Sequence, residues 1–146
     1  MLKKIKVYVD GQAGTTGLQI HQRLANHPYV NLIKIPEEMR KDDALRREMM
    51  NEADIVFLCL PDSAAREAVS FIEPDNKRTK VLDASTAHRT NPDWVYGLPE
   101  ISADQRQAIQ ASARTTVPGC HATAFCLPLY PLIKAGIVPA DYPVSS

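Results

Sequence analysis

The sequence lacks the features that mark several classes of protein. Its 17 Lys and Arg residues balance 17 Asp and Glu residues, so it has no positive excess with which to bind nucleic acid or a membrane surface. No uncharged apolar run approaches the roughly 20 residues of a transmembrane helix, and no cleavable signal follows Met1. The three cysteines have no paired spacing. We therefore expect free thiols in a reducing compartment, and a cytoplasmic protein without nucleic-acid or membrane partners.

The composition of the 146 residues is that of a folded domain, with 45% hydrophobic and 23% charged residues. Apolar runs of strand length alternate along the chain with segments of helical periodicity. Strands are expected at residues 4–9, 29–35, 55–60, 81–83 and 114–117, and helices near 18–24, 42–51, 62–71 and 102–112. This alternation is typical of βαβ units. The sequence therefore predicts an α/β fold with a doubly wound, mostly parallel sheet.

Several residues are expected to shape the helices. Asp62 or Ser63 can cap the helix near 62–71, and Ser102 with Gln105 fits a capping box. Further along, Pro128 and Pro131 interrupt an apolar stretch at 122–134. Proline cannot donate a hydrogen bond inside a helix, so we expect this last helix to be kinked or to start late.

Glycines follow the first expected strand and open the first helix. Gly11, Gly14 and Gly17 permit close approach of a pyrophosphate to the backbone, and the helix N-terminus offers it free N–H groups. Thr15 and Thr16 add hydroxyl groups at the same place. The spacing is G-x-x-G-x-x-G, which differs from the common dinucleotide pattern, so a tight glycine-rich turn is the alternative. Its position at the first strand–helix junction favours a Rossmann-like dinucleotide-binding domain.

The end of the second expected strand bears on the choice of cofactor. Glu37 and Glu38 stand where a carboxylate would take the ribose 2′-hydroxyl of NAD. They follow a proline, however, and are themselves followed by Arg40 and Lys41, which could meet a 2′-phosphate. We therefore expect NADP rather than NAD, although these residues could also form a merely charged surface loop.

Cys120 is the most informative of the three cysteines. It follows a short strand and a Pro-Gly bend, at the expected start of a helix, where free N–H groups stabilise a thiolate and can hold an oxyanion. Cys59 and Cys126 lie in apolar segments and fit structural roles. His121 adjoins Cys120 but points elsewhere on a helix, so it is a poor base for that thiol. The spacing of Cys120, His121 and Cys126 is not that of a zinc site, and we expect no metal.

Four segments together resemble a known family of enzymes. They are GQAGTTGL at 11–18, LDASTAHR at 82–89, YGLPEI at 96–101 and PGCHAT at 118–123. The sequence resembles, over essentially its whole length, the N-acetyl-γ-glutamyl-phosphate reductases of arginine biosynthesis, and its compact first loop resembles their shorter, type 2 branch. The resemblance implies NADPH-dependent reduction of an acyl phosphate to an aldehyde, with release of phosphate.

The resemblance also implies roles for particular residues. Cys120 matches the family's nucleophile, which would form a thioester with the acyl group. Ser85 matches the motif D-x-S-x-x-x-R and would meet the nicotinamide side, and Arg89 of the same motif would bind the substrate's phosphate or carboxylate. A surface salt bridge is the alternative for Arg89. The implied cofactor-binding residues are Gly11, Gly14, Thr15, Thr16, Gly17, Leu60, Pro61 and Ser85.

The end of the chain departs from the family. Five of the 11 prolines lie from Pro118 onward, and the chain ends at Ser146 soon after a turn-like segment at 141–143. We therefore expect a dinucleotide-binding domain at 1–118, followed at 119–146 by the nucleophile loop and the start of a truncated catalytic domain. The resemblance implies a general-base histidine in the missing C-terminal part, and a homo-oligomer for the full-length protein. We expect the present chain to bind NADP and to turn over poorly.

Two other functions fit the same residues. Aspartate-semialdehyde dehydrogenase shares the expected fold and the cysteine chemistry, although the YGLPE and PGCHAT segments favour the glutamyl-phosphate enzyme. A non-catalytic dinucleotide-binding module, in which Cys120 is only a reactive thiol, is the alternative from a different class.

Overall fold

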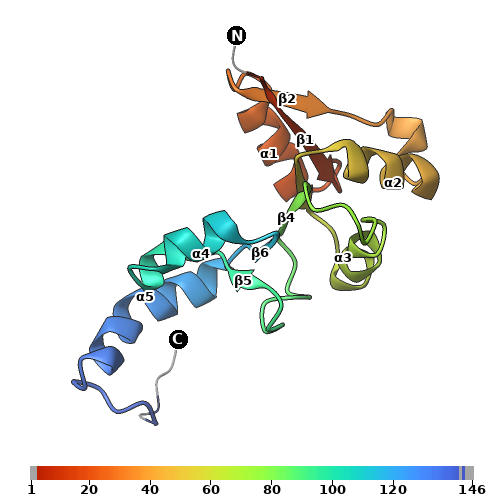
Figure 1. Ribbon diagram of the computed structural model, residues 1–146. Coiled ribbons are helices and arrows are strands. Elements are labelled where there is room, and N and C mark those ends of the chain that lie inside the picture. Colours follow the sequence, from red (N-terminus) through yellow and green to blue (C-terminus); the bar gives the residue numbers. More distant parts are fainter. Residues whose placement is uncertain (1–2, 142, 144–146) are drawn as a thin grey trace.

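Strands and helices alternate along the chain in the computed structural model, which describes residues 3–141 and 143 (Figure 1). The strands are β1 (Ile5–Asp10), β2 (Val30–Ile33), β3 (Ile55–Leu58), β4 (Lys80–Asp83), β5 (Val95–Tyr96) and β6 (Arg114–Thr116). The helices are α1 (Thr15–Leu24), α2 (Asp43–Glu52), α3 (Asp62–Val69), α4 (Gln105–Ala111) and α5 (Cys120–Lys134), with 3-10 turns η1 (Glu37–Met39) and η2 (Pro99–Ile101).

The strands form one parallel sheet in the order β2-β1-β3-β4-β6-β5. Strand β1 pairs with β2 on one side and with β3 on the other. After β2, the chain therefore crosses over β1 and adds the remaining strands on the opposite side of it. The predicted doubly wound α/β fold is confirmed. The short strand β5 was not expected, because a strand of two residues carries no periodic pattern.

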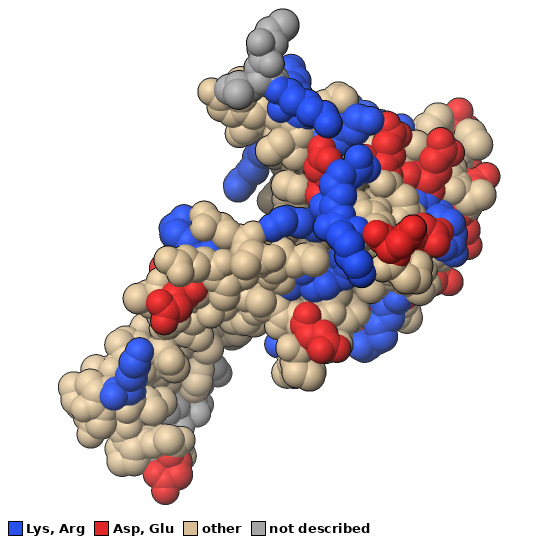
Figure 2. Space-filling view, in the orientation of Figure 1, with Lys and Arg blue, Asp and Glu red and all other residues tan. Residues whose placement is uncertain are grey.

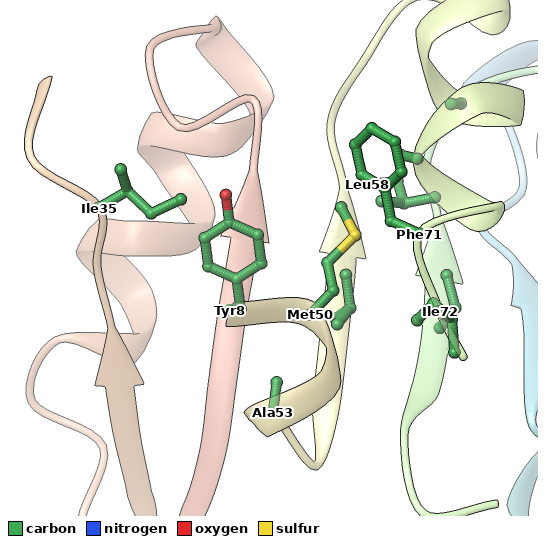
Figure 3. Packing of buried hydrophobic residues seen from close by; sticks show 11 residues of the cluster. Tyr8, Ile35, Met50, Ala53, Leu58, Phe71 and Ile72 are labelled. Carbon is green, nitrogen blue, oxygen red and sulfur yellow. The ribbon is translucent and has the colours of Figure 1, made fainter. Parts of the chain in front are cut away.

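The hydrophobic core lies between the sheet and helices α2 and α3 (Figure 3). Met50 of α2 is fully buried, and it packs in one cluster with Tyr8 of β1, Leu58 of β3 and Phe71 beyond α3. Strand β3 alternates between half-buried and buried residues, so it is less completely covered on both faces than its unbroken apolar run indicates.

Helix α2 confirms the helix expected at 42–51, and its exposed face is charged. Asp42 caps it, because its carboxylate accepts a hydrogen bond from the Leu45 N–H at 3.0 Å. Its other face buries both Met50 and the charged Arg46, which is only 8% exposed. A buried arginine needs a partner, and that partner belongs to the site described below.

Both capping predictions for α3 and α4 were wrong, since the side chains have other partners. Neither Asp62 nor Ser63 caps α3, whose N-cap is Pro61, because the Asp62 carboxylate accepts hydrogen bonds from a distant loop. No capping box forms between Ser102 and Gln105, because the Gln105 side-chain amide donates to the Tyr96 carbonyl. Ser102 contacts the helix through its backbone carbonyl, which accepts from the Gln105 N–H, and not through its hydroxyl.

Helix α5 does not start late, as its two prolines had suggested, but at Cys120, and it continues through both prolines. It begins at Cys120, and the Thr123 N–H donates to the Gly119 carbonyl at 2.9 Å to close the first turn. Pro128 and Pro131 lie well inside the helix, which has no buried residue and extends from the rest of the molecule (Figure 1). The turn expected at 141–143 includes Tyr142, which lies outside the described residues. No helix in the described part of the chain is both long and apolar enough to span a membrane.

Candidate active site

The glycine loop joins β1 to α1 at the carboxyl ends of the strands. Gly11 has φ +85°, a conformation that side chains other than glycine rarely adopt. A Cβ on Gly11 would overlap the Cys59 carbonyl oxygen, and a Cβ on Gly17 would overlap the Gly11 carbonyl oxygen. Gly14 is the N-cap of α1, and its N–H donates to the Gly11 carbonyl at 3.1 Å. The loop therefore presents bare backbone and a helix N-terminus at the sheet edge, which suits a pyrophosphate.

Two cavities lie on either side of this loop. The larger, about 540 Å³, reaches from Tyr8 and Asp10 past the loop to Leu60 and Pro61. The smaller, about 310 Å³, is lined by Gly14, Thr15, Thr16, Cys59, Leu60 and Ala84. Because both cavities share Gly14, Cys59 and Leu60, they form one path along the ends of β1, β3 and β4. All the predicted cofactor-binding residues except Gly17 and Ser85 line this path.

A buried ion pair forms one wall of the larger cavity. Arg46 of α2 donates from Nη2 to Oδ2 of Asp10 at 2.9 Å, and both side chains are less than a tenth exposed. Burial opposes the charge of Arg46, but its hydrogen bonds with Asp10 and then with Asp43 outweigh burial and raise the pKa of the guanidinium. Burial, followed by the charge of Asp10, raises the pKa of the neighbouring Tyr8 phenol. This wall is therefore polar, rigid and electrically balanced.

Cations line the outer end of the same cavity. Arg40 and Lys41 both contribute to its lining, whereas Glu37 and Glu38 do not. Glu37 instead pairs with Arg40 and accepts a hydrogen bond from Gln12 at 3.4 Å. Since Asp10 is already paired with Arg46, the charges facing the open end of the cavity are mainly positive.

The Cys59 thiol lies between the two cavities. Burial, then the charges of Asp10 and Asp83, raises its pKa to about 11. The group stays a neutral thiol near pH 7, as expected for a structural cysteine.

A loop at residues 84–89 follows β4 and carries Ser85 and Arg89. Ser85 is buried, and its hydroxyl donates to Oδ2 of Asp83 at 2.8 Å rather than facing either cavity. Thr86 is held from the other side, because the Asp62 carboxylate accepts from its N–H at 3.0 Å and from its hydroxyl at 2.6 Å. The hydroxyl bond, and the backbone bond to a lesser degree, lower the pKa of Asp62.

Arg89 brings this loop to the start of α5. Its Nη2 donates to the Ala84 carbonyl at 3.3 Å, and Ala84 lines the smaller cavity. Its Nη1 lies 2.7 Å from where a Cβ of Gly119 would stand, so only glycine lets the guanidinium approach this closely. Arg89 therefore connects the dinucleotide path with the residue before Cys120.

Cys120 is exposed and is the first residue of α5, as predicted. Cys126, on the same helix, is half-buried, and His121 is exposed. The structure thus brings Arg89 to Gly119, the residue before Cys120, with the glycine loop and Leu60-Pro61 along the adjoining edge.

The sequence analysis assigned no role to the acidic residues that organise this edge. Asp10 and Asp83 end β1 and β4, and each is almost completely buried with a basic partner, Arg46 or His88. An aspartate at the end of an apolar strand was the available signal in both cases. The partners could not be identified, because they lie elsewhere in the chain.

The parallel sheet, its glycine turn at the switch point between β1 and β3, and the cavities beside that turn define a dinucleotide-binding α/β domain. The family model described as "Semialdehyde dehydrogenase, NAD binding domain" matches residues 34–109, slightly more than half of the chain. The chain belongs to this family.

Curated relatives agree with the resemblance seen in the motifs. The chain is 52% identical over 139 residues to "N-acetyl-gamma-glutamyl-phosphate reductase 2" of Pseudomonas putida, covering 95% of this chain and 44% of the relative. It is 53% identical over 138 residues to "N-acetyl-gamma-glutamyl-phosphate reductase" of Burkholderia ambifaria, covering 94% of this chain and 43% of the relative. The chain therefore spans less than half the length of these relatives.

Solved structures share the fold. Aspartate semialdehyde dehydrogenase from Francisella tularensis matches with a TM-score of 0.67 at 17% identity, covering 90% of this chain and 41% of that one. The enzyme from Candida albicans, described with NADP, matches with a TM-score of 0.59 at 16% identity, covering 91% of this chain and 48% of that one. At these identities the likeness supports the fold alone.

Proposed function

We propose that this chain supplies the cofactor-binding domain and the nucleophile of an NADP-dependent reductase. The enzyme would convert N-acetyl-γ-glutamyl phosphate to N-acetylglutamate semialdehyde in arginine biosynthesis. The observation that carries the proposal is the approach of Arg89 to Gly119, directly before Cys120 at the start of α5, and its bond to Ala84 of the dinucleotide path. The names of the relatives at about half identity agree with it.

The larger cavity suits the phosphorylated adenosine half of NADP. Arg40 and Lys41 stand at its open end, where they can bind a 2′-phosphate, and Arg40 would exchange its bond with Glu37 for that anion. Gly11, Gly14 and Gly17 would hold the pyrophosphate, with the Thr15 and Thr16 hydroxyl groups beside it. Leu60 and Pro61 would lie along the dinucleotide toward the smaller cavity.

Ser85 takes a more limited role than its motif implies. Its hydroxyl is bonded to Asp83 and accepts from the Ala87 N–H at 3.1 Å, so we propose that it shapes the nicotinamide side through the backbone of its loop. Ala84, which lines the smaller cavity, is the residue of this loop nearest the cofactor path.

The chemistry begins at the Cys120 sulfur. The thiolate attacks the acyl carbon, a carbon–sulfur bond forms, and the carbon–oxygen bond to phosphate breaks with its electron pair leaving on the phosphate. The free N–H groups at the start of α5 stabilise the oxyanion, and Arg89 binds the departing phosphate or the substrate carboxylate. NADPH, when held along the cofactor path by the glycine loop, would supply the hydride that reduces the thioester carbon. Hydride addition leaves a tetrahedral oxyanion on the thioester oxygen, and this oxyanion re-forms the C=O bond as the carbon–sulfur bond breaks, which releases the aldehyde and the Cys120 thiolate.

None of His21, His27, His88 and His121 matches the family's general-base motif. We therefore expect the 146-residue chain to bind NADP and to reduce the acyl phosphate at near-background rates, since loss of an acid–base group alone costs about 10²–10⁴-fold. In the longer protein we propose homo-oligomeric assembly and a location in the cytoplasm.

Alkylation followed by mass spectrometry tests the nucleophile. Under limiting iodoacetamide near neutral pH, Cys120 should be labelled faster than Cys59 and Cys126, and N-acetylglutamyl phosphate should slow that labelling. The Cys126→Ser variant should keep this protection, whereas Cys120→Ser should lose the fast phase. β-Aspartyl phosphate serves as the comparison substrate, and better protection by it would favour the aspartate-semialdehyde enzyme.

Two outcomes count against the proposal. Slow, equal labelling of all three cysteines would remove the activated thiol, and leave a dinucleotide-binding domain without its catalytic role. Protection of Cys120 by NADP but by neither acyl phosphate would favour a non-catalytic binding module.

A further inference from the structure

We propose that His88 is a positioning residue for Arg89, acting through a buried pair with Asp83. The inference rests on the proposed function, because it concerns the anion-binding group beside the proposed nucleophile. It is drawn from a cluster of Asp83, His88 and Trp94 that neither the cofactor path nor the acyl-transfer chemistry uses directly.

Asp83 is the anchor of this cluster. It is fully buried at the end of β4, and its carboxylate accepts from the Ser85 N–H at 2.9 Å and the Ser85 hydroxyl at 2.8 Å. Nδ1 of His88 lies 2.6 Å from Oδ2 of the same carboxylate, and Nδ1 is the donor because a carboxylate only accepts. The Asp83 carbonyl also accepts from the Val117 N–H at 2.7 Å. Asp83 therefore ties the 84–89 loop to the segment that leads into α5.

His88 is held on two sides. Its ring is 8% exposed and stacks on Trp94, with centroids 4.2 Å apart and planes 10° apart. The stack fixes the plane of the ring, and the bond to Asp83 fixes its rotation within that plane.

Helix α3 holds the loop through hydrogen bonds at Thr86 and Ala87, and none of its hydrogen bonds in the described structure reaches Arg89. Asp62 holds Thr86, and Arg66 donates from Nη1 to the Ala87 carbonyl at 2.7 Å. Beyond Ala87, the side-chain constraints on the loop come from His88. Among the described residues, the Arg89 side chain makes one hydrogen bond, 3.3 Å long, to the Ala84 carbonyl, and its buried Nε has no partner there. The guanidinium thus depends on the preceding residue for its direction toward Gly119.

Packing alone would not require a histidine. A phenylalanine would fill the same space and stack on Trp94, but it could not donate to Asp83. An asparagine places its amide nitrogen where Nδ1 stands, whereas a glutamine amide reaches the position of Nε2. The variants His88→Phe, His88→Asn and His88→Gln therefore separate the hydrogen bond from the stack.

The test detects the positive charge beside Cys120 from alkylation rates, and it needs neither cofactor nor substrate. The rate of Cys120 alkylation is measured with iodoacetate, an anion, and with iodoacetamide, which is neutral and of similar size. In the wild type the ratio of the two rates should exceed that of Arg89→Met by about fivefold, the effect of one nearby unit charge. His88→Phe and His88→Gln should fall toward the Arg89→Met ratio, and His88→Asn should stay near the wild type. Thermal unfolding of each variant reports its folding separately.

A His88→Phe ratio equal to the wild type, whatever its melting temperature, would show that His88 only packs and would overturn the proposal. A His88→Asn ratio as low as that of His88→Gln would overturn it as well, and this pair decides the matter if the Phe variant does not fold. A wild-type ratio equal to that of Arg89→Met would show that the Arg89 charge does not act beside Cys120, and it would overturn the proposal too. Because the reagents need neither NADP nor acyl phosphate, failure of the proposed reductase activity would not produce any of these results.

Discussion

The two ends of the sheet are built differently. All eleven members of the hydrophobic cluster lie between Tyr8 and Val81, in the part formed by β1 to β4 and their helices. Beyond β4, Leu98 is the one hydrophobic residue counted as buried in the described part of the chain, and α5 buries none. Figure 2 shows the same contrast on the surface, where Lys, Arg, Asp and Glu crowd the first part and the α5 arm is almost free of them.

The difference separates stability from chemistry. The first part contains the hydrophobic core, while the second part carries Cys120 on a helix whose apolar side chains face solvent. Those exposed side chains are Phe125, Leu127, Tyr130, Leu132, Ile133 and, just beyond the helix, Ile137. Changes in the first part should therefore alter the free energy of unfolding, and changes in the second part should alter reactivity with little effect on folding.

The largest effect is expected at Arg46. Arg46→Met leaves Asp10 buried without its partner, and should lower the free energy of unfolding by about 3–5 kcal/mol, measured by urea denaturation. Arg47→Met is the matched control, because each guanidinium lies 5.0 Å from the Phe71 ring centroid and Arg47 is otherwise in an exposed pair with Glu73. The control should cost less than about 1 kcal/mol. Equal losses would mean that the buried pair does not distinguish these arginines.

A cavity in the core should cost nearly as much. Met50→Ala removes a fully buried side chain and should destabilise the protein by about 2–5 kcal/mol. Leu132→Ala, in the exposed face of α5, should change the free energy of unfolding by less than about 0.5 kcal/mol. A large loss at Leu132 would contradict the division between the two parts.

Gly119→Ala should separate reactivity from folding. The new Cβ would displace only the tip of Arg89, a flexible side chain, so the loss of stability should stay below about 1 kcal/mol. The preference of Cys120 for iodoacetate over iodoacetamide should nevertheless fall. The control is Gly136→Ala, which strains a glycine at φ +70° with no atom within 4 Å of the new Cβ, and should leave that preference unchanged.

The smallest effect is expected at Cys59. Because its pKa is raised to about 11 from the ordinary value of 9.0, the thiol stays protonated through neutral pH, and iodoacetamide should label it only as the pH approaches 11. Peptide mapping at pH 7.5 and pH 10.5 checks this. Rapid labelling at pH 7.5 would show that burial and the two aspartates do not protect this thiol.

The sequence predicted what depends on local pattern. Alternation of apolar runs and helical segments indicated the parallel sheet, and the Pro-Gly bend indicated that Cys120 opens a helix. It missed β5, because two residues are too short for periodicity to register. The capping predictions failed at Asp62, whose carboxylate reaches Thr86 in another loop. Partners of this kind are set by tertiary packing rather than by local sequence.

In the site, too, the features set by local sequence were predicted and the partners set by tertiary packing were not. The glycine loop was predicted because its demands are local, as the positive φ of Gly11 shows. The buried charge of Arg46 was not predicted, since its partner lies 36 residues earlier in the chain. The approach of Arg89 to Gly119 was likewise invisible, although both residues had been noticed separately.

The outer strands of the sheet have a consequence for aggregation. In the described structure, β2 and β5 each pair with a strand on one side only, and they are four and two residues long. Pro36 and Pro99, a few residues beyond them, cannot donate a backbone hydrogen bond. The edge strands therefore offer few free backbone N–H and C=O groups with which a strand of another chain could pair. This protects the sheet against the strand-by-strand growth that produces fibrils.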